Sequence, residues 1–439
     1  MSGRAVATWA CWLMKAEPND QTNGSRIEDS RIFNRRLVFE TIFQRGPISR
    51  VEIGGVVGLK PQTISSITRE LLDQGLIAEA GRSTGLRGQP QTYLEPNARA
   101  GFSVGVHLDQ GLFRLKVYDL KRTELVRHDV RCDTSDPEES LRRVAAELLT
   151  ALDEIGADVA RVWGIGVVLP TFGDPDCDFD YGMPEWGRWN TVSVAEMLGG
   201  FTGLPVFVEN DATAAAIGER FDRPAGHATD FCYIYIGNGT GAGFIVDGMP
   251  FKGAHGNSGE VGLLPVFGVD GSMVWPDRNN EDILSWNGLI AACADPGQPA
   301  PGLAQDMPDL DRLVRQRDHR LMAWVAQGAR SLRDITAVIE LLFAPEIIVV
   351  GGMLPRSVVE LLVEHAYPLR STPAARRDRS TPRLAPAALI EDAAVTGAAM
   401  LPIFVNTNPN FRHLYVRQIT QDSRPPDAAA PQTMPPSDR

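Results

Sequence analysis

The 439-residue sequence predicts an α/β protein in which a small α+β unit of three helices and a β-hairpin precedes a larger α/β domain. Three observations predict this fold class. Apolar residues recur at helical spacing from Ile32 to Leu72, strand and helix patterns alternate after Pro96, and the stretch Ile234–Val266 links short strands through dense glycines. Such glycines let backbone amides approach an anionic or polyhydroxyl ligand without Cβ clashes, so the stretch also predicts a binding site.

Composition and length indicate a globular protein of several domains. Hydrophobic residues make up 43% of the chain and charged residues 22%, and this length predicts two or three domains. The cysteines lack paired spacing, which argues against a disulfide framework and a thiolate metal site and favours a reducing, cytoplasmic compartment. The run Ala5–Met14 has no small-residue cleavage site, so we expect residues 1–25 to form a disordered leader, and no later segment has the uncharged length of a membrane helix.

Charge is unevenly distributed along the chain. Residues 1–100 hold 13 Lys and Arg against 10 Asp and Glu, whereas the whole chain has a net charge of −12. A mildly basic front on a strongly acidic body indicates that only the front faces nucleic acid.

Helix signals follow one another in this front. Apolar spacing predicts a first helix over residues 32–44. Ser49 caps the next helix, residues 50–57, and Glu52 stands where a capping box places its acidic partner. Pro61 is a favoured first helical residue and begins a third helix over residues 61–74. A strand follows Gly75, and residues 82–91 form a loop before a return strand at Thr92, which completes a winged helix-turn-helix.

The third helix predicts DNA recognition, because its polar side carries small donors and one arginine, the residue types that read base edges in a major groove. The loop segment Arg87-Gly88-Gln89-Pro90 resembles segments that insert an arginine into a narrow minor groove, although a solvated loop is an equal alternative. A plain packing module is the alternative for the whole unit. The predicted DNA contacts are Lys60, Gln62, Thr63, Ser65, Ser66 and Arg69 on and before the helix, and Arg87 and Gln89 on the loop.

The larger domain begins after Pro96, where strands alternate with crossing helices and glycine turns. The expected strands are residues 102–106, 112–118, 162–169, 206–208 and 346–350, with helices over residues 138–155, 212–220 and 320–343. Its second half holds the most specific motifs: Glu209-Asn210-Asp211-Ala212, the run Gly239–Glu260, Pro345–Gly352 and Asp392–Ala399.

These motifs resemble those of the ROK family (repressors, open reading frames, kinases), a bacterial group of sugar kinases and sugar-responsive repressors. The resemblance covers roughly residues 100–405 and implies the actin-like ATPase fold, in which two α/β lobes flank a cleft. Many ROK repressors also carry a MarR-like winged helix-turn-helix where this chain has one.

The resemblance implies a sugar site in the cleft. Asn210 matches the asparagine that binds the sugar, Asp211 the aspartate that takes a proton from its hydroxyl, and Glu260 the glutamate that accepts sugar hydroxyls. Trp189 and Asn190 match a tryptophan and asparagine of the sugar-side wall, and His255 is a further candidate contact. The residues alone leave alternatives open, because an Asn-Asp pair after a strand is also a common helix N-cap, and Trp189 and His255 also suit lobe packing and a loop.

The family's kinase and zinc motifs are altered here. Leu263 stands where the kinases have a histidine, and residues 267–275 hold no cysteine where they have a zinc cluster. At the first phosphate turn the metal-binding aspartate becomes His107, and Asp109 and Gln110 replace the small residues. A carboxylate at Asp109 would face the anionic phosphates, so we expect no phosphotransferase activity, no bound metal and no cofactor.

The sequence therefore predicts a cytoplasmic DNA-binding transcriptional regulator, a repressor of carbohydrate-use genes, that senses a sugar or sugar derivative. We expect a homodimer or homotetramer on an inverted-repeat operator of double-stranded DNA, with no membrane partner. An ATP-dependent sugar kinase that also binds DNA is the alternative, and a scaffold with an empty cleft is a third. The predicted domains are a leader (1–25), the winged helix-turn-helix (26–95), the ROK domain (96–420) and a disordered tail (421–439).

Overall fold

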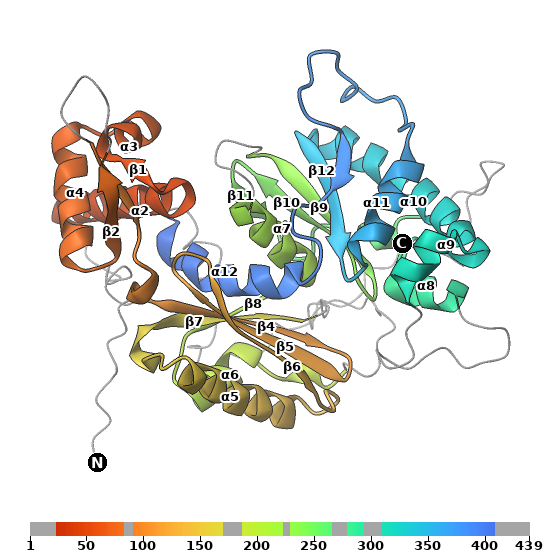
Figure 1. The fold of residues 1–439 in the computed structure, drawn as a ribbon, viewed down its shortest axis with the longest axis horizontal. Helices are drawn as coiled ribbons and strands as arrows, with labels where there is room; N and C mark the ends of the chain where they lie inside the picture. Colours follow the sequence, from red (N-terminus) through yellow and green to blue (C-terminus); the bar gives the residue numbers. More distant parts are fainter. Residues whose placement is uncertain are drawn as a thin grey trace, which may run out of the picture.

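The computed structural model describes residues 23–82, 91–169, 187–222, 229–265, 279–293 and 309–408. In this part of the chain an N-terminal unit and two α/β lobes surround a central helix (Figure 1). Within the same ranges, no helix is long and apolar enough to cross a membrane. The predicted leader, the tail and the loop residues 83–90 lie outside the described ranges, apart from the last residues of the leader, which begin the first described helix.

The N-terminal unit is a three-helix bundle with a small antiparallel sheet. Its helices are α2 (Asn23–Arg45), α3 (Arg50–Val57) and α4 (Pro61–Asp73), and its strands β1 (Ile48–Ser49), β2 (Ile77–Arg82) and β3 (Thr92–Pro96) pair in the order β1-β3-β2. The predicted capping box is present, because Ser49 Oγ accepts the Glu52 N–H and the Glu52 carboxylate accepts the Ser49 N–H at 2.8 Å. Gly58 then ends α3 in the left-handed conformation, which glycine adopts without strain.

The first lobe is built on a five-stranded sheet in the order β6-β5-β4-β7-β8. The strands are β4 (Phe102–Asp109), β5 (Leu112–Asp119), β6 (Glu124–Arg131), β7 (Val162–Val168) and β8 (Val206–Glu209). Helices α5 (Pro137–Glu154) and α6 (Val194–Thr202) pack on one face and close a hydrophobic core of their own. Short 3-10 turns lie at η1 (Ala98–Ala100), η2 (Val159–Arg161) and η4 (Trp189–Thr191).

The second lobe repeats the same plan with the order β11-β10-β9-β12-β13. Its strands are β9 (Phe231–Ile236), β10 (Thr240–Val246), β11 (Met249–Phe251), β12 (Ile347–Gly352) and β13 (Leu384–Pro386). Helix α7 (Asp211–Asp222) packs against β9 and β10. The remaining elements are η5 (Val261–Leu263), α8 (Trp286–Cys293), α9 (Leu310–Gln316), α10 (His319–Phe343) and α11 (Arg356–Ala366).

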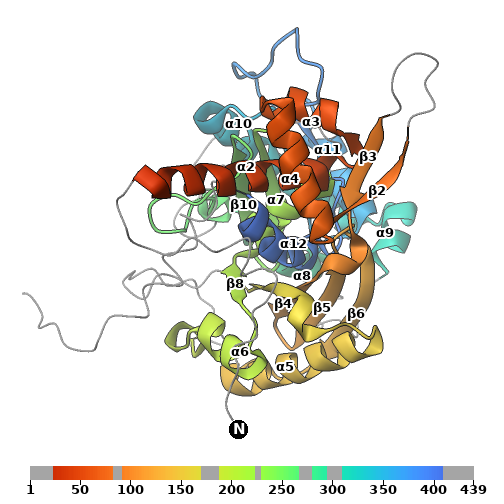
Figure 2. The ribbon, with the colours of Figure 1, turned by 90° about the vertical axis from the view of Figure 1, so that its left-hand side faces the viewer.

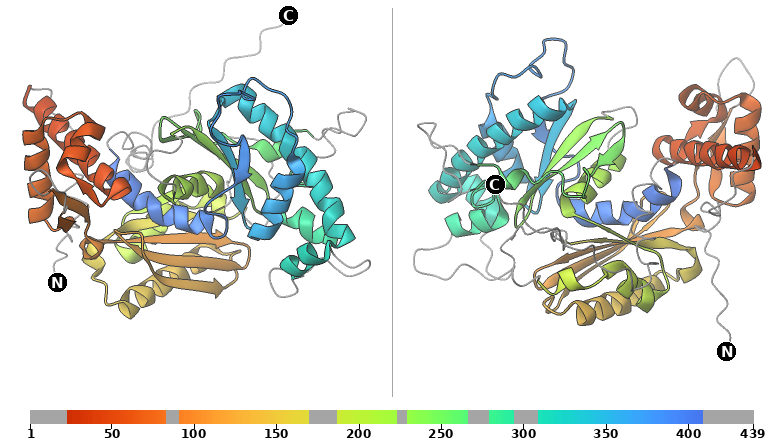
Figure 3. Two further views of the ribbon diagram at one scale, coloured as in Figure 1. Left: turned by 45° about the horizontal axis from the view of Figure 1, so that its top comes forward. Right: turned by 180° about the vertical axis from the view of Figure 1, so that it is seen from behind.

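Helix α12 (Ala393–Thr407) lies between the two sheets and reaches the N-terminal unit (Figure 3). It approaches its neighbours closely, because glycines remove the Cβ atoms that would block it. A Cβ on Gly397 would lie 1.8 Å from the carbonyl oxygen of Ala214 in α7, and a Cβ on Gly166 in β7 would lie 1.9 Å from that of Ala398. The central helix, the first-lobe sheet and α7 therefore form one closely packed block.

Candidate functional site in the cleft

A cavity of about 580 Å³ opens between the lobes, where β4, β8 and β9 end. In α/β folds the carboxyl ends of the strands are the usual place for a ligand. The first lobe contributes His107, Asp109 and Gln110, and the β8–α7 junction contributes Asn210 and Asp211. The second lobe lines the rest with Tyr235, the glycine-rich turn Asn238–Ala242, Ser258–Glu260, Asn279, Glu281, Asp282, residues of α8 and Met353. The predicted residues Asn210, Asp211 and Glu260 thus meet at one cavity.

Asn210 and Asp211 shape the start of α7 as well as the cavity wall. Asn210 Oδ1 accepts the N–H of Thr213 at 2.7 Å, and Asp211 Oδ1 accepts the N–H of Ala212 at 2.8 Å. The first of these bonds is the N-cap that the sequence offered as an alternative reading. The amide group of Asn210 and the second carboxylate oxygen of Asp211 are left to face a ligand, so capping and ligand binding are compatible.

The cavity is strongly acidic. Five carboxylates line it, Asp109, Asp211, Glu260, Glu281 and Asp282, and its described lining has no lysine or arginine. Burial, then the neighbouring charges of Asp109 and Glu281, raises the pKa of Asp211 to about 7. Burial, then Glu281 and Asp211, raises the pKa of Glu260 to about 7. Burial also lowers the pKa of His107, so its imidazole is neutral at pH 7 and supplies no counter-charge.

The altered phosphate turn closes on the opposite lobe. Asn238 Nδ2, in the glycine-rich turn, donates a hydrogen bond to Asp109 Oδ1 at 2.8 Å. The backbone N–H of Gln110 donates to the same oxygen at 2.7 Å. Asp109 therefore presents its carboxylate to the second turn across the cleft. A second cross-lobe contact follows at Glu209, which accepts Lys252 Nζ at 2.9 Å while its side chain is 3% exposed.

The raised pKa of Asp211 predicts a stability penalty at neutral pH. Between its ordinary pKa near 4 and its folded pKa of about 7, the folded state holds a proton that the unfolded chain releases, so stability falls as pH rises through this window. Asp211→Asn keeps an oxygen for the Ala212 N–H and removes the charge. We expect the melting temperature of this variant to exceed the parent's at pH 8, and the gain to shrink at pH 5.

A matched control for this pH dependence is Asp136→Asn, at the N-cap of α5. Hydrogen bonds from the Glu139 and Glu138 amides and the Arg188 side chain keep the pKa of Asp136 below its ordinary value, so it stays ionised at both pH values. Its substitution should shift the melting temperature equally at pH 5 and pH 8. An Asp211→Asn protein that melts below the parent at pH 8 would contradict the predicted penalty.

Two predicted effector contacts lie away from the cavity, and the side chain of a third lies outside the description. Trp189 is 2% exposed in the core of the first lobe, and its indole N–H donates to the carbonyl of Thr134 at 2.8 Å, so the structure corrects its assignment from ligand wall to packing. His255 is exposed in the loop after β11 and does not line the cavity, which corrects that expectation too. Asn190 lies in η4, and its side chain is outside what the structure describes.

Sequence reasoning missed the carboxylate of Glu281. It approaches the turn that carries Gly239 and Thr240, because a Cβ on Gly239 would lie 2.8 Å from Glu281 Oε1. The only signal in the sequence was the polar run Asn279-Asn280-Glu281-Asp282 before an apolar pair. Such a run is typical of an ordinary loop, so only the folded arrangement identifies it.

Candidate DNA-binding face

The polar side of α4 forms an exposed surface. Gln62, Ser65, Ser66 and Arg69 are exposed, as is Lys60 in the turn before the helix, whereas Thr63 is half-buried. Ile64, Ile67, Thr68 and Leu71 hold the opposite side in the core. A groove of about 680 Å³ runs along this polar side and is completed by Arg31 of α2. Figure 2 shows α2 crossing beside α4. The predicted contacts Arg87 and Gln89 lie outside the described residues.

Two arginines offset the acidic residue beside this surface. Glu70 Oε2 accepts Arg31 Nη2 at 3.3 Å, and Glu70 Oε1 accepts Arg35 Nη1 at 3.4 Å. The charge of Glu70 is thereby compensated, which leaves Arg69 free to face an anionic partner. A row of small hydroxyl and amide groups with one arginine suits base edges and phosphates.

No group of three or more His, Cys, Asp or Glu within the described ranges is arranged to hold a metal ion. Leu263 ends η5, and residues 266–278, which include the stretch without cysteines, lie outside those ranges.

Comparison with known proteins assigns the larger domain to a family. The model of the ROK family matches residues 103–403. The chain is 28% identical over 332 residues to the protein y4fQ of Sinorhizobium fredii, covering 75% of this chain and 81% of that one. It is 27% identical to the xylose repressor of Caldicellulosiruptor bescii over 230 residues and 28% identical to the DNA-binding transcriptional dual regulator NagC of Escherichia coli over 255 residues. These matches cover 52% and 57% of this chain, and 57% and 61% of the two regulators.

Among solved structures, a ROK family transcriptional regulator described as a homologue of the E. coli MLC protein superimposes with a TM-score of 0.62. The match covers 89% of this chain and all of that one at 24% identity, so it supports the fold. Because 89% of this chain is more than residues 103–403 alone, the superposition also includes part of the chain outside the family model. With more than half of its length matched by the family model, the chain belongs to the ROK family.

Proposed function

We propose that this protein is a DNA-binding transcriptional regulator, a repressor of carbohydrate-use genes, whose ROK domain senses a sugar in the cleft. The main support for this proposal is the exposed polar face of α4. Phosphorylation of a sugar does not require a helix that reads DNA, whereas regulation of transcription does. The names of two relatives, a xylose repressor and NagC, support the same function. We place the protein in the cytoplasm as a homodimer or homotetramer, so that two α4 helices face an inverted repeat.

Operator binding tests this proposal directly. Two recognition helices should protect half-sites separated by about one helical turn or a multiple of it. Gln62→Ala should relax base preference, at about 1–3 kcal/mol if its contact with a base is bidentate. Arg69→Ala should weaken binding whether it meets a base or a phosphate. Footprinting and affinity measurements at one fixed salt concentration check both results, because phosphate contacts make affinity salt-dependent.

Arg142→Ala supplies the control for Arg69→Ala. Arg142 is an exposed arginine on α5 whose side chain pairs with Glu138, and it lies in the first lobe rather than the N-terminal unit. Its loss should leave operator affinity unchanged. A footprint that survives substitution of Gln62, Ser66 and Arg69 together would remove α4 from the reading role.

The chemistry of the cavity restricts the ligand. Carboxylates accept hydrogen bonds from sugar hydroxyl groups, and a carboxamide both accepts and donates them. An acidic lining with no lysine or arginine among its described residues repels an anion. We therefore expect neutral sugars, or sugars with an amino group, to bind better than sugar phosphates. D-Xylose, D-glucose and N-acetyl-D-glucosamine are the first probes for a thermal-shift screen, with their phosphates as matched comparisons.

A sugar kinase that also binds DNA is the second candidate, favoured by Asp211 at the cavity. A phosphotransferase needs a metal and an anion cradle at the first turn. Here neutral His107 and the carboxylate of Asp109 occupy that turn. We expect no sugar phosphorylation above background in a coupled ADP-release assay with hexoses, amino sugars and polyols. Sugar-dependent ADP release that Asp211→Asn abolishes would establish the kinase instead.

A further inference from the structure

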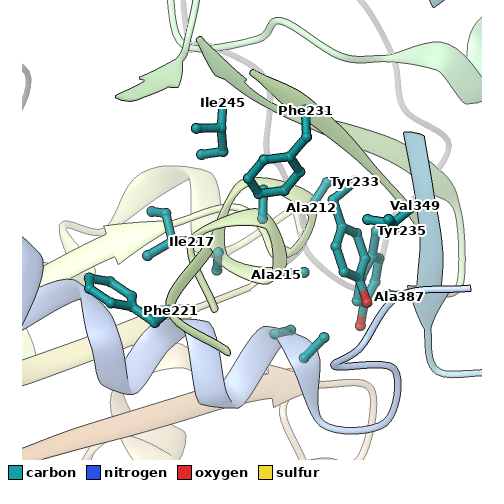
Figure 4. Packing of buried hydrophobic residues seen from close by; sticks show 14 of the residues in the cluster. Ala212, Ala215, Ile217, Phe221, Phe231, Tyr233, Tyr235, Ile245, Val349 and Ala387 are labelled. Carbon is teal, nitrogen blue, oxygen red and sulfur yellow. The ribbon is translucent and has the colours of Figure 1, made fainter. Parts of the chain in front are cut away.

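Helix α7 begins at the cavity and ends at the N-terminal unit. Its first residue, Asp211, and the residue before it, Asn210, line the cavity. Its last turns carry Arg220 and Phe221, which face α2. Figure 4 shows this course, with Ala212 at one end of the helix and Phe221 at the other. One rigid element thus touches both the proposed ligand and the unit that carries α4.

The far end of α7 is tied to α2 by charge and by aromatic packing. Arg220 Nη2 lies 3.0 Å from Glu40 Oε1, and the two side chains are 16% and 10% exposed. The ring of Phe221 meets Phe43 edge-on, with ring centroids 5.6 Å apart. Arg122 of the first lobe donates a hydrogen bond to the carbonyl of Phe221 and lies over the ring of Phe43. Movement of this end of α7 would therefore act on α2 at several points.

Glu40 is the point where three helices meet. Its Oε1 accepts Arg220 of α7, Asn408 Nδ2 beyond the end of α12 at 3.2 Å, and Gln44 Nε2 of α2 at 2.9 Å. Because the carboxylate is buried, loss of one of these partners would leave a buried charge without full compensation, which is energetically unfavourable. This one carboxylate thus joins α2 to α7 and to the residue that follows α12.

The apolar contacts follow the same route. A continuous buried cluster runs from Phe39, Ile42 and Phe43 in α2, through Phe221 and Phe404, into the second lobe. The rings of Phe221 and Phe404 are 5.8 Å apart and edge-on. The core beneath α5 and α6 in the first lobe is a separate cluster. The N-terminal unit also meets the first lobe directly, because the ring of Phe39 lies 5.9 Å from that of Trp163 in β7. The packing therefore joins α2 both to the far end of α7 and to the first-lobe sheet.

We propose that α7 carries the ligand signal to the DNA-binding unit, with Arg220 and Glu40 as the positioning residues that receive it. This inference rests on the proposed function. A sugar that binds Asn210 and Asp211 acts on the first turn of α7, which packs closely against the backbone of α12 at Gly397. The displacement reaches α2 through the Glu40 contact and moves α4 with it. The ligand supplies the energy through its differential affinity for the two positions.

Arg220→Gln tests the route without touching the cavity. D-Xylose, D-glucose and N-acetyl-D-glucosamine serve as probes, and operator affinity is measured with and without each. We expect the variant to bind sugar within about twofold of the parent and to keep its sugar-free operator affinity. The sugar-induced change in operator affinity should fall at least fivefold, where a typical coupling is about 5- to 150-fold. Arg220→Lys, which keeps the charge, should restore part of the response, and unchanged sugar affinity shows that the variants are folded.

Lys121→Gln is the matched control. Lys121 Nζ pairs with Glu95 Oε1 at 2.7 Å and so also joins the N-terminal unit to the first lobe, but from the β5–β6 turn instead of α7. Its loss should leave the response intact. A full response in Arg220→Gln, or an equal loss in Lys121→Gln, overturns the inference while the proposed function stands. If none of the three sugars changes the operator affinity of the parent protein, that result contradicts both the proposed sugar sensing and this inference.

Discussion

Replacing Asp211 or Glu260 by alanine is expected to leave operator binding intact and to abolish its response to the sugar. Both carboxylates line the cavity, and neither lies in the N-terminal unit. Loss of a hydrogen bond between a charged acceptor and a ligand hydroxyl costs about 1.5–3 kcal/mol, which weakens sugar binding about 10- to 150-fold. Operator affinity with and without sugar, at one salt concentration, measures the effect.

Glu360→Ala on α11 is the control for these two variants, because Glu360 is exposed and pairs only weakly with Arg356 at 3.8 Å. It should respond to sugar like the parent. If Asp211→Ala or Glu260→Ala also responds like the parent, the effector binds somewhere other than this cavity.

The largest loss of stability is expected from Gly397→Ala. The new Cβ would lie 1.8 Å from the carbonyl oxygen of Ala214 and 2.3 Å from its carbon, so the backbones of α7 and α12 must separate. Overpacking of a closely packed interior costs about 1–3 kcal/mol, and here rigid backbone on both sides puts the cost at about 3 kcal/mol. Denaturant unfolding followed by far-ultraviolet circular dichroism measures this change.

Gly200→Ala in α6 is the matched substitution, since a Cβ there meets no atom within 4 Å. Alanine favours a helix over glycine by about 1 kcal/mol, so this variant should be slightly more stable than the parent. A Gly397→Ala protein as stable as the parent would show that α7 and α12 separate easily, which would also weaken the case for α7 as a rigid link.

Local signals predicted the helices whose ends are fixed by nearby side chains. Ser49 and Glu52 set the start of α3, and Pro61 set the start of α4, because capping needs only residues within one turn. The sequence did not reveal β6, whose residues are mostly exposed and charged, so that no apolar alternation marks it. Edge strands of this kind owe their structure to the neighbouring strand, which local patterns cannot show.

The residues of the site also fall into those that the sequence predicted and those that only the folded structure identifies. Asn210, Asp211 and Glu260 were predicted through family motifs, and the structure gathers them at one cavity. Glu281 was missed because it meets Thr240, which lies 41 positions earlier in the sequence, only in the folded chain. Trp189 was assigned to the ligand because tryptophan suits both sugar stacking and a core, and only its buried indole with the Thr134 hydrogen bond decides between them.

The two five-stranded sheets share one strand order. In each lobe a central strand, β4 or β9, pairs antiparallel with the next strand and parallel with a later one. The end of β4 and the turn after β9 therefore occupy equivalent places in the two sheets, and they touch through Asp109 and Asn238. The turn after β9 lines the cavity with glycines, whereas the equivalent end of β4 presents the carboxylate of Asp109, so equivalent positions in the two lobes offer a ligand backbone amides on one side and a negative charge on the other.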